Sequence, residues 1–233
     1  MSVRTGTTEA VEVAAALADP VRLAVMRRLL LQGPATVATF VAETGTTQSN
    51  VSNHLSILRA RGLVKTERQG RRVLYRVADH SVAQLVEALL SLEGPPGRPA
   101  VPAPIAVART CYDHLAGRLG VTLLEALWRV GALGRPDAGG SMELGPAGPR
   151  VFASLRVDLV KPASSRRRFA YGCLDWTERK AHTGGALGAA ICERAREAGW
   201  VVPQPGTRAV LLTTAGKRAL RRSVGLRFHD RAG

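Results

Sequence analysis

Residues 47–77 constrain the fold more than any other stretch of this chain. The first part, TQSNVSNHLSILRARG, places Val51, Leu55 and Leu58 on one face of a helix. After Gly62, the runs LVKTE and VLYRV alternate as strands do, and the residues between them are rich in arginine. This order predicts a helix followed directly by a β-hairpin with a basic tip.

Three more helices are predicted before this stretch. Asp19-Pro20 suits a helix start, because Asp accepts hydrogen bonds as an N-cap and Pro is tolerated at the first helical position. Gly33-Pro34 breaks the chain, and Thr36 and Thr47 are placed to cap the helices that follow. The apolar spacing puts the three helices at residues 11–17, 21–31 and 37–43.

The polar face of the fourth helix predicts contacts with DNA bases. Amide and hydroxyl side chains recognise base edges in the major groove, and arginines on a hairpin tip suit the backbone or the minor groove. His54 fits a packing role or a DNA contact better than a metal-ligand role. The candidate DNA-binding residues are Thr47, Gln48, Ser49, Asn50, Ser52, Asn53, His54, Arg59, Arg68, Arg71 and Arg72.

The stretches ALADPVRLAVMRRLL and TQSNVSNHLSILRARGLVKTERQGRRVLYRV together resemble the winged helix-turn-helix of the ArsR/SmtB family of bacterial repressors. The resemblance covers roughly residues 10–92. It implies a homodimer, formed through residues 9–17 and 81–92, that binds palindromic double-stranded DNA and leaves it when an inducer binds. Metal-sensing members often carry a Cys-x-Cys in the third helix, or Asp and His ligands along the last helix. Here the third helix reads ATVATFVA and the last offers only Asp79-His80 at its start, so neither familiar metal site is intact.

The net charge of +15 indicates a polyanionic partner such as nucleic acid. Only four of the 33 basic residues are lysine, a bias that suits phosphate and guanine contacts but is equally explained by GC-rich coding. Three cysteines without a signal segment favour free thiols in a reducing compartment, and no apolar run approaches the length of a membrane helix. We therefore expect a cytoplasmic protein with no membrane partner.

A proline-rich segment divides the chain. Residues 94–104 read GPPGRPAVPAP, which is typical of a stiff linker. We expect a DNA-binding and dimerisation domain at 1–92, a linker at 93–104, an effector or sensor domain at 105–228 and a tail at 229–233. The expected fold class is mainly α with small β wings.

The second half contains an internal repeat. HLAGRLG at 114–120 matches HTGGALG at 182–188, and the same offset of 68 residues aligns Glu125 with Glu193 and Gly131 with Gly199. The spacing predicts helices at 115–130 and 185–198, each followed by a hairpin and a capped helix, with Thr213 or Thr214 as the last cap. We interpret residues 110–160 and 178–228 as two winged-helix-like units.

Two cysteines and two histidines are candidate ligands in this half. Cys111, His114, Cys173 and His182 would suit zinc or another thiophilic ion. The alternative is that the cysteines are small buried hydrophobes and the histidines hold helix starts. Arg179 stands where the offset of 68 would place a second Cys111, so the sequence predicts that the Cys-x-x-His is special to the first copy. A reactive thiol beside Arg109, His114 or the arginines at 166–168 is a further alternative, and Cys192 is expected in the core.

The leading effector hypothesis is a small organic or anionic inducer near Tyr112, Trp128, Tyr171, Trp176 and Arg179. No cofactor is certain, and nothing resembles a catalytic motif, so we expect no enzyme. An enzyme alternative would use Cys111 or Cys173 as nucleophile. The predicted function is a sequence-specific transcriptional regulator, more a repressor than an activator. The alternatives are a thiol- or metal-responsive sensor that uses Cys111 and Cys173, and a nonspecific architectural DNA-binding protein.

Overall fold

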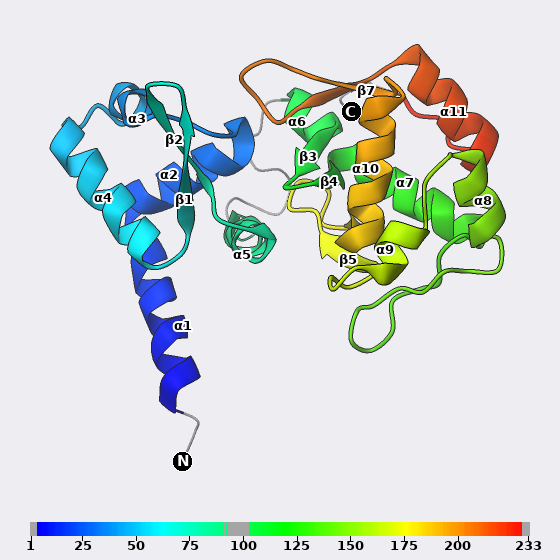
Figure 1. Ribbon diagram of the computed structural model, residues 1–233, viewed down its shortest axis with the longest axis horizontal. Helices are drawn as coiled ribbons and strands as arrows, with labels where there is room; N and C mark the ends of the chain where they lie inside the picture. The colour runs from blue at the N-terminus through cyan, green and yellow to red at the C-terminus, as the bar shows by residue number, and fades with distance from the viewer. Residues whose placement is uncertain (1–3, 91, 93–102, 230–233) are drawn as a thin grey trace. The chain divides into compact units, whose positions relative to one another are not determined.

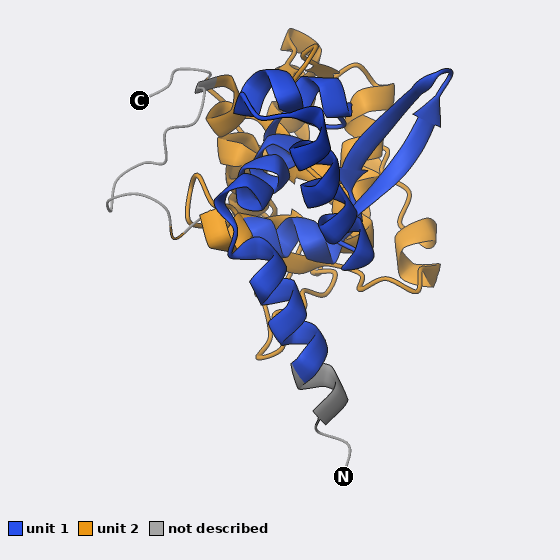
Figure 2. Cartoon of the chain, turned by 90° about the vertical axis from the view of Figure 1, so that its left-hand side faces the viewer, with its two compact units in different colours: residues 1–86 blue, residues 87–233 orange. Residues whose placement is uncertain are grey.

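A computed structural model describes residues 4–90, 92 and 103–229 of the chain (Figure 1). The predicted linker at 94–104 and the tail at 229–233 therefore lie almost wholly outside the described residues. The chain forms two compact units, residues 1–86 and 87–233, which are coloured separately in Figure 2. The boundary between the units falls within the last helix of the first one, a few residues before the predicted boundary at 92.

The first unit contains the predicted helices. Its helices are α1 (Arg4–Leu17), α2 (Pro20–Gln32), α3 (Val37–Thr44), α4 (Gln48–Ala60) and α5 (His80–Leu90). The side chain of Asp19 accepts a hydrogen bond from Arg22 N at 2.9 Å, and Thr47 accepts one from Asn50 N at 3.3 Å. These bonds satisfy backbone donors that a helix start would otherwise leave without partners. The predicted caps of α2 and α4 are confirmed.

The predicted hairpin follows α4. Strands β1 (Val64–Gln69) and β2 (Arg72–Val77) are antiparallel, and their last pair, Gln69 with Arg72, leaves only two residues in the turn. Gly70 occupies this turn with a positive φ of 60°, which glycine adopts without steric cost. Ala35, between α2 and α3, pairs with Tyr75 of β2 through two backbone hydrogen bonds. The hairpin is thereby joined to the helical core as a wing.

The second unit is built from short elements whose order repeats. They are α6 (Ala103–Val107), β3 (Arg109–Cys111), β4 (His114–Ala116), α7 (Gly117–Arg129), α8 (Gly148–Ser154), α9 (Val160–Ser164), β5 (Tyr171–Leu174), β6 (Ala181–Gly184), α10 (Gly185–Glu197), β7 (Val201–Pro203), β8 (Val210–Leu212) and α11 (Thr214–Val224). We call the part from β3 to α9 the first half and the part from β5 to α11, with the segment that leads into β5, the second half. Each half runs from a β-hairpin through a long helix to a second helix. The hairpin β7–β8 and the Thr213 cap of α11 lie where they were predicted.

Two predictions about this unit were wrong. Residues 114–116 do not enter a helix, because they form β4, and α7 begins only at Gly117. The hairpins β3–β4 and β5–β6 were not predicted, since β3 and β4 are three-residue strands buried throughout and a strand of four residues such as β5 is too short for a clear alternating pattern. In the first half, a single bridge from Leu133 to Leu144 stands where a second strand pair was expected.

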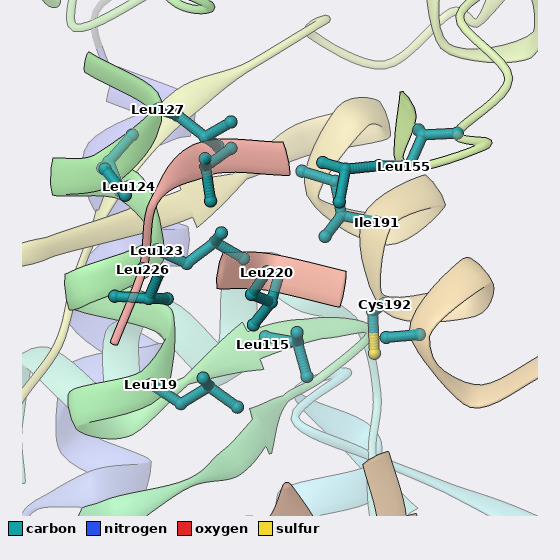
Figure 3. Packing of buried hydrophobic residues seen from close by; sticks show 14 of the residues in the cluster. Leu115, Leu119, Leu123, Leu124, Leu127, Leu155, Ile191, Cys192, Leu220 and Leu226 are labelled. Atoms are coloured by element: carbon teal, nitrogen blue, oxygen red, sulfur yellow. The ribbon is translucent and has the colours of Figure 1, made fainter. Parts of the chain in front are cut away.

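The core of the second unit is aliphatic. Leucines from α7 and α11 pack against Ile191 and Cys192 of α10 (Figure 3). Cys192 is buried in this cluster, which confirms its predicted place in the core. The halves are also interleaved, because α7 packs against β6 and α10 packs against β4. Each long helix therefore supports the hairpin of the other half.

Candidate functional sites

The predicted DNA-binding residues of the first unit are on the surface. Val51, Leu55 and Leu58 anchor α4 in the core, so the other face of the helix turns to solvent. The exposed residues of this face and of the wing tip are Thr47, Gln48, Ser49, Asn50, Ser52, Asn53, Arg59, Arg68, Arg71 and Arg72. The local sequence places these donors and acceptors on one amphipathic helix with its N-cap and on the tip of one hairpin.

His54 differs from the rest of this set. It is half-buried, and its Nδ1 lies 3.6 Å from Asp19 Oδ1 at the start of α2. Hydrogen bonding to the backbone N–H of Arg22 and the nearby charges of Arg22 and His54 lower the pKa of Asp19. This contact favours the packing role for His54 over a base contact.

A buried cluster lies at the centre of the second unit. Cys111 pairs with His114 across β3–β4, and Cys173 pairs with His182 across β5–β6. Residues directly opposite on antiparallel strands carry neighbouring side chains, so each hairpin presents one thiol and one imidazole together. Their two Sγ atoms and one ring nitrogen of each histidine all lie within 4.8 Å of one another. We call these four residues the Cys-His cluster.

The repeat of this unit therefore includes the cysteine. His182 follows Cys173 by nine residues, whereas His114 follows Cys111 by three, so the second hairpin is six residues longer. The extra residues are the strand pair Leu174 and Ala181 and four more in the turn between β5 and β6, and they hide the match in an alignment without gaps. The prediction that Cys111 has no counterpart in the second copy was wrong, because Cys173 and not Arg179 takes its place, and only the three-residue spacing to the histidine is special to the first copy.

The ring nitrogens of the two histidines have distinct partners. His114 Nε2 lies 3.0 Å from His182 Nε2. On the far side of each ring, His114 Nδ1 lies 3.2 Å from Asp113 Oδ1, and His182 Nδ1 lies 3.4 Å from Asp175 Oδ2. A carboxylate beside Nδ1 favours the tautomer with the proton on that nitrogen. Both Nε2 atoms are thereby directed into the cluster. The alternative expected each histidine to hold a helix start. The nitrogens instead lie against an aspartate and against the other histidine.

Each of these carboxylates is held by an arginine. Arg109 of β3 contacts Asp175 at 3.0 Å, and Arg167, just before β5, contacts Asp113 at 2.6 Å. Arginine and aspartate come from opposite halves in both pairs. Asp175 also accepts a hydrogen bond from Gly117 N at 2.6 Å, at the start of α7. It therefore joins the second hairpin to the first helix.

The electrostatics of the cluster follow from this arrangement. Burial opposes ionisation of Asp175, but the charge of Arg109 prevails and holds the pKa of that carboxyl well below its usual range. Burial likewise opposes protonation of His182, while hydrogen bonding to Asp175 and Cys111 raises its pKa to about 9. The pKa of the Cys111 thiol is raised by three causes, which are the contact with Cys173, burial and the charge of Glu87 in that order. Glu87 Oε2 lies 3.2 Å from Cys111 Sγ. Without a bound cation, Cys111 is therefore a protonated thiol rather than an activated nucleophile.

Two glycines allow the halves to approach this closely. A Cβ added to Gly120 of α7 would lie 3.2 Å from His182 Cβ and 2.4 Å from Leu115 O. A Cβ added to Gly188 of α10 would lie 3.2 Å from His114 Cβ and 2.3 Å from Thr183 O. The two contacts are equivalent in the repeat. In the sequence, Gly120 and Gly188 served only to identify the repeat, and their packing role was not predicted. A glycine inside a helical pattern is nevertheless a signal of close packing.

The predicted inducer residues do not surround one space. Trp128 lies near the end of α7, about 16 Å along the helix from Gly117 at 1.5 Å per residue. Its Nε1 donates to Gly134 O at 3.0 Å. Trp176 is buried under the Arg109 guanidinium, whose central carbon lies 5.4 Å from the ring centroid, while Arg179 is exposed in a turn. Tyr112 occupies the β3–β4 turn with a positive φ of 55°.

No helix within the described ranges combines the length and apolar character needed to cross a membrane.

Comparisons with known proteins agree with the first unit's architecture. A family described as a helix-turn-helix domain matches residues 17–67. The HTH-type transcriptional repressor SmtB of Mycobacterium tuberculosis is 46% identical over 75 residues, which cover 32% of this chain and 55% of that protein. A solved homodimeric winged helix-turn-helix domain from Mycobacterium bovis, titled a possible ArsR-family regulator, is 33% identical, with a TM-score of 0.35 over 38% of this chain and 83% of that one.

A longer match reaches into the second unit. The uncharacterized HTH-type transcriptional regulator YdfF of Bacillus subtilis is 35% identical over 182 residues, which cover 76% of this chain and 80% of that protein. An alignment of 182 residues extends far beyond the 86 residues of the first unit. With its helices, caps and wing in place, the chain belongs to the ArsR/SmtB family of helix-turn-helix transcriptional regulators.

Proposed function

We propose that this regulator is a sequence-specific repressor that binds a palindromic operator as a homodimer. One observation carries the proposal: α4 exposes a continuous row of amide and hydroxyl side chains beside a wing with a basic tip. Such a helix fits the major groove, where Gln and Asn pair with adenine and Ser with several bases. The arginines at 68, 71 and 72 then hold the phosphate backbone or the minor groove.

Exposed apolar side chains support the homodimer. Val11 of α1 is 61% exposed, and Leu85 of α5 is 39% exposed. Both lie in the segments through which the family resemblance implies dimerisation. A second copy would cover these side chains, and its twofold symmetry would match two half-sites of a palindrome.

A competition experiment tests this function. The full chain is bound to a labelled palindromic fragment from its own promoter, and unlabelled specific or random duplex of equal length competes at a stated salt concentration. We expect the specific duplex to compete at least about 1,000-fold better, as specific binding sites typically do. A ratio near one would contradict sequence-specific binding and favour the architectural alternative, in which the net charge of +15 alone holds DNA.

We propose further that the effector acts on the second unit. Of the effector alternatives, a metal- or thiol-based signal has the stronger support, because the two hairpins converge on the Cys-His cluster. The small-molecule alternative is weaker, since its aromatic residues are dispersed. Release from the operator would be measured in the same competition assay after zinc, chelator or a thiol oxidant is added to the full chain.

A further inference from the structure

We propose that the Cys-His cluster is a closed, four-coordinate zinc site that joins the two halves of the second unit. The site differs from both familiar metal positions of the family, which would lie in the third and last helices of the first unit. Its four ligands are Cys111, His114, Cys173 and His182. The proposal is independent of whether the chain represses transcription.

The geometry fits a tetrahedral ion. With Zn–S bonds of about 2.3 Å and Zn–N bonds of about 2.0–2.1 Å, the ligand atoms of a tetrahedral site lie roughly 3.3–3.8 Å apart. Here they lie within 4.8 Å of one another, and the two Nε2 atoms are 3.0 Å apart. Side-chain adjustments of about 1 Å would therefore form the site. Two thiolates and two imidazoles form a ligand set typical of zinc.

The facing imidazoles need a cation between them. When each neutral ring carries its proton on the Nδ1 that faces an aspartate, both Nε2 atoms present lone pairs to each other at 3.0 Å. A shared proton or a metal ion removes this repulsion. A disulfide between Cys111 and Cys173 would leave the two lone pairs unsatisfied. Carboxylates behind metal-binding histidines are a recurrent arrangement that orients the ring and raises its basicity.

The charges also balance around a divalent ion. Two thiolates neutralise Zn²⁺, while Asp113 and Asp175 are neutralised by Arg167 and Arg109. Glu87, whose Oε2 lies 3.2 Å from Cys111 Sγ, adds one negative charge, and the charge of Arg208 acts on both groups and offsets it. All four ligand residues are at most 1% exposed. A site with four protein ligands and no opening to solvent has no position for substrate, so the bound ion would hold the hairpins together rather than catalyse a reaction.

The test begins with the full-length wild-type chain, purified without a tag and with a thiol reductant present. Native mass spectrometry and elemental analysis are expected to give one zinc per chain. After chelation, Co²⁺ is expected to restore a stoichiometric complex with the visible bands of tetrahedral cobalt and a near-ultraviolet thiolate charge-transfer band. Failure of the reduced wild-type chain to bind either ion would overturn the proposal, whatever the variants show.

Matched cysteine variants locate the ion. Cys111→Ala and Cys173→Ala remove proposed ligands, whereas Cys192→Ala makes the same change in the apolar core. We expect both ligand variants to lose more than about 100-fold in zinc affinity, since even outer-shell changes cost about 10–100-fold, and Cys192→Ala to bind as the wild type does. Retention of zinc by both ligand variants, or equal loss in all three, would contradict the assignment.

Two further measurements separate the remaining outcomes. Asp175→Asn keeps an oxygen near His182 but removes the charge, and we expect a loss of about 10–100-fold in zinc affinity. Thiols are also counted in the unfolded, chelated protein. None of the three cysteines forms a disulfide in the structure, so three reactive thiols are expected, whereas one would indicate a disulfide between Cys111 and Cys173 and overturn the metal site. None of these readouts involves DNA, so failure here is distinguishable from failure of the proposed repressor function.

Discussion

The exposed face of α4 and the Cys-His cluster differ in how the chain assembles them. Every candidate residue on α4 and the wing lies within 26 consecutive positions, on elements that local caps and turns define. The cluster draws its residues from two hairpins whose ligands are 59 or more positions apart, and it depends on arginines from the opposite half. Substitutions on α4 should therefore alter DNA binding and spare folding. Substitutions around the cluster should alter folding itself.

The largest effect is expected when the buried ion pair is broken. In Asp175→Ala, the guanidinium of Arg109 stays buried without its carboxylate, and the start of α7 loses a hydrogen bond. We expect a loss of about 3–5 kcal/mol in the free energy of unfolding. Denaturant unfolding of the metal-free full chain measures it, so that zinc does not contribute.

Glu125→Ala is the matched control for this change. Glu125 pairs with Lys180 at 3.0 Å, but both side chains are about half exposed or more. Its removal should cost less than about 1 kcal/mol. Equal losses for the two variants would mean that the buried pair contributes no more to stability than a surface pair. The expectation that substitutions around the cluster alter folding would then fail.

The same contrast decides what could be predicted from the sequence. The helices of the first unit were predicted because Asp19, Thr36 and Thr47 cap them and because their apolar spacing is local. The repeat was found from its glycines and histidine. The cluster was not, because eight residues separate Cys173 from His182, its partner across the hairpin, and no local pattern shows which strands will pair. Metal ligation by all four residues was considered, but the two hairpins that bring them together were missed.

Asn53→Ala should leave folding unchanged and reduce base recognition. Asn53 is exposed on α4, so we expect a stability change within about 0.5 kcal/mol. We expect a loss of about 1–3 kcal/mol in binding free energy at the specific operator and little change on random DNA. Binding titrations on both duplexes measure the difference, and equal losses on the two would contradict base reading.

Arg71→Ala provides the comparison for Asn53→Ala. Arg71 lies in the exposed turn of the wing, where a phosphate contact carries no sequence information. Its loss should weaken binding to both duplexes alike and reduce the slope of log K against log salt by about 1. Loss confined to the operator would instead assign a base contact to the wing.

Gly188→Ala tests how closely α10 must pack against β6 of its own half, and against His114 of the other half at 3.2 Å. The added methyl would meet the backbone oxygen of Thr183 at 2.3 Å, and backbone has little freedom to move aside. We expect a loss of about 1–3 kcal/mol, measured by denaturant unfolding of the full chain. Gly134→Ala is the control, because its methyl would meet its nearest neighbour, Glu143 O, at an ordinary 3.6 Å. A stability close to that of Gly134→Ala would show that the helix and hairpin can separate without cost.

The smallest effect is expected at Asp19, the N-cap of α2. Asp19→Ala removes the hydrogen bond to Arg22 N and should cost about 1 kcal/mol, whereas Asp19→Asn retains an acceptor. The pKa of Asp19 is lower in the folded chain than its ordinary value, so its contribution is present above that ordinary value and is lost as the pH falls through the folded-state pKa. Unfolding curves between neutral and acidic pH should show this loss in the wild type and not in Asp19→Asn.

The exchange of arginines between the halves has a consequence for the order of synthesis. Arg109 leaves the ribosome 66 residues before Asp175, and Asp113 leaves it 54 residues before Arg167. Until the second hairpin has been translated, the charged side chains of Arg109 and Asp113 must stay hydrated, and His114 has no second histidine to face. The nascent chain can therefore complete its first unit early, while the second unit has to wait as an open intermediate until its second hairpin, which ends at Gly184, has been translated.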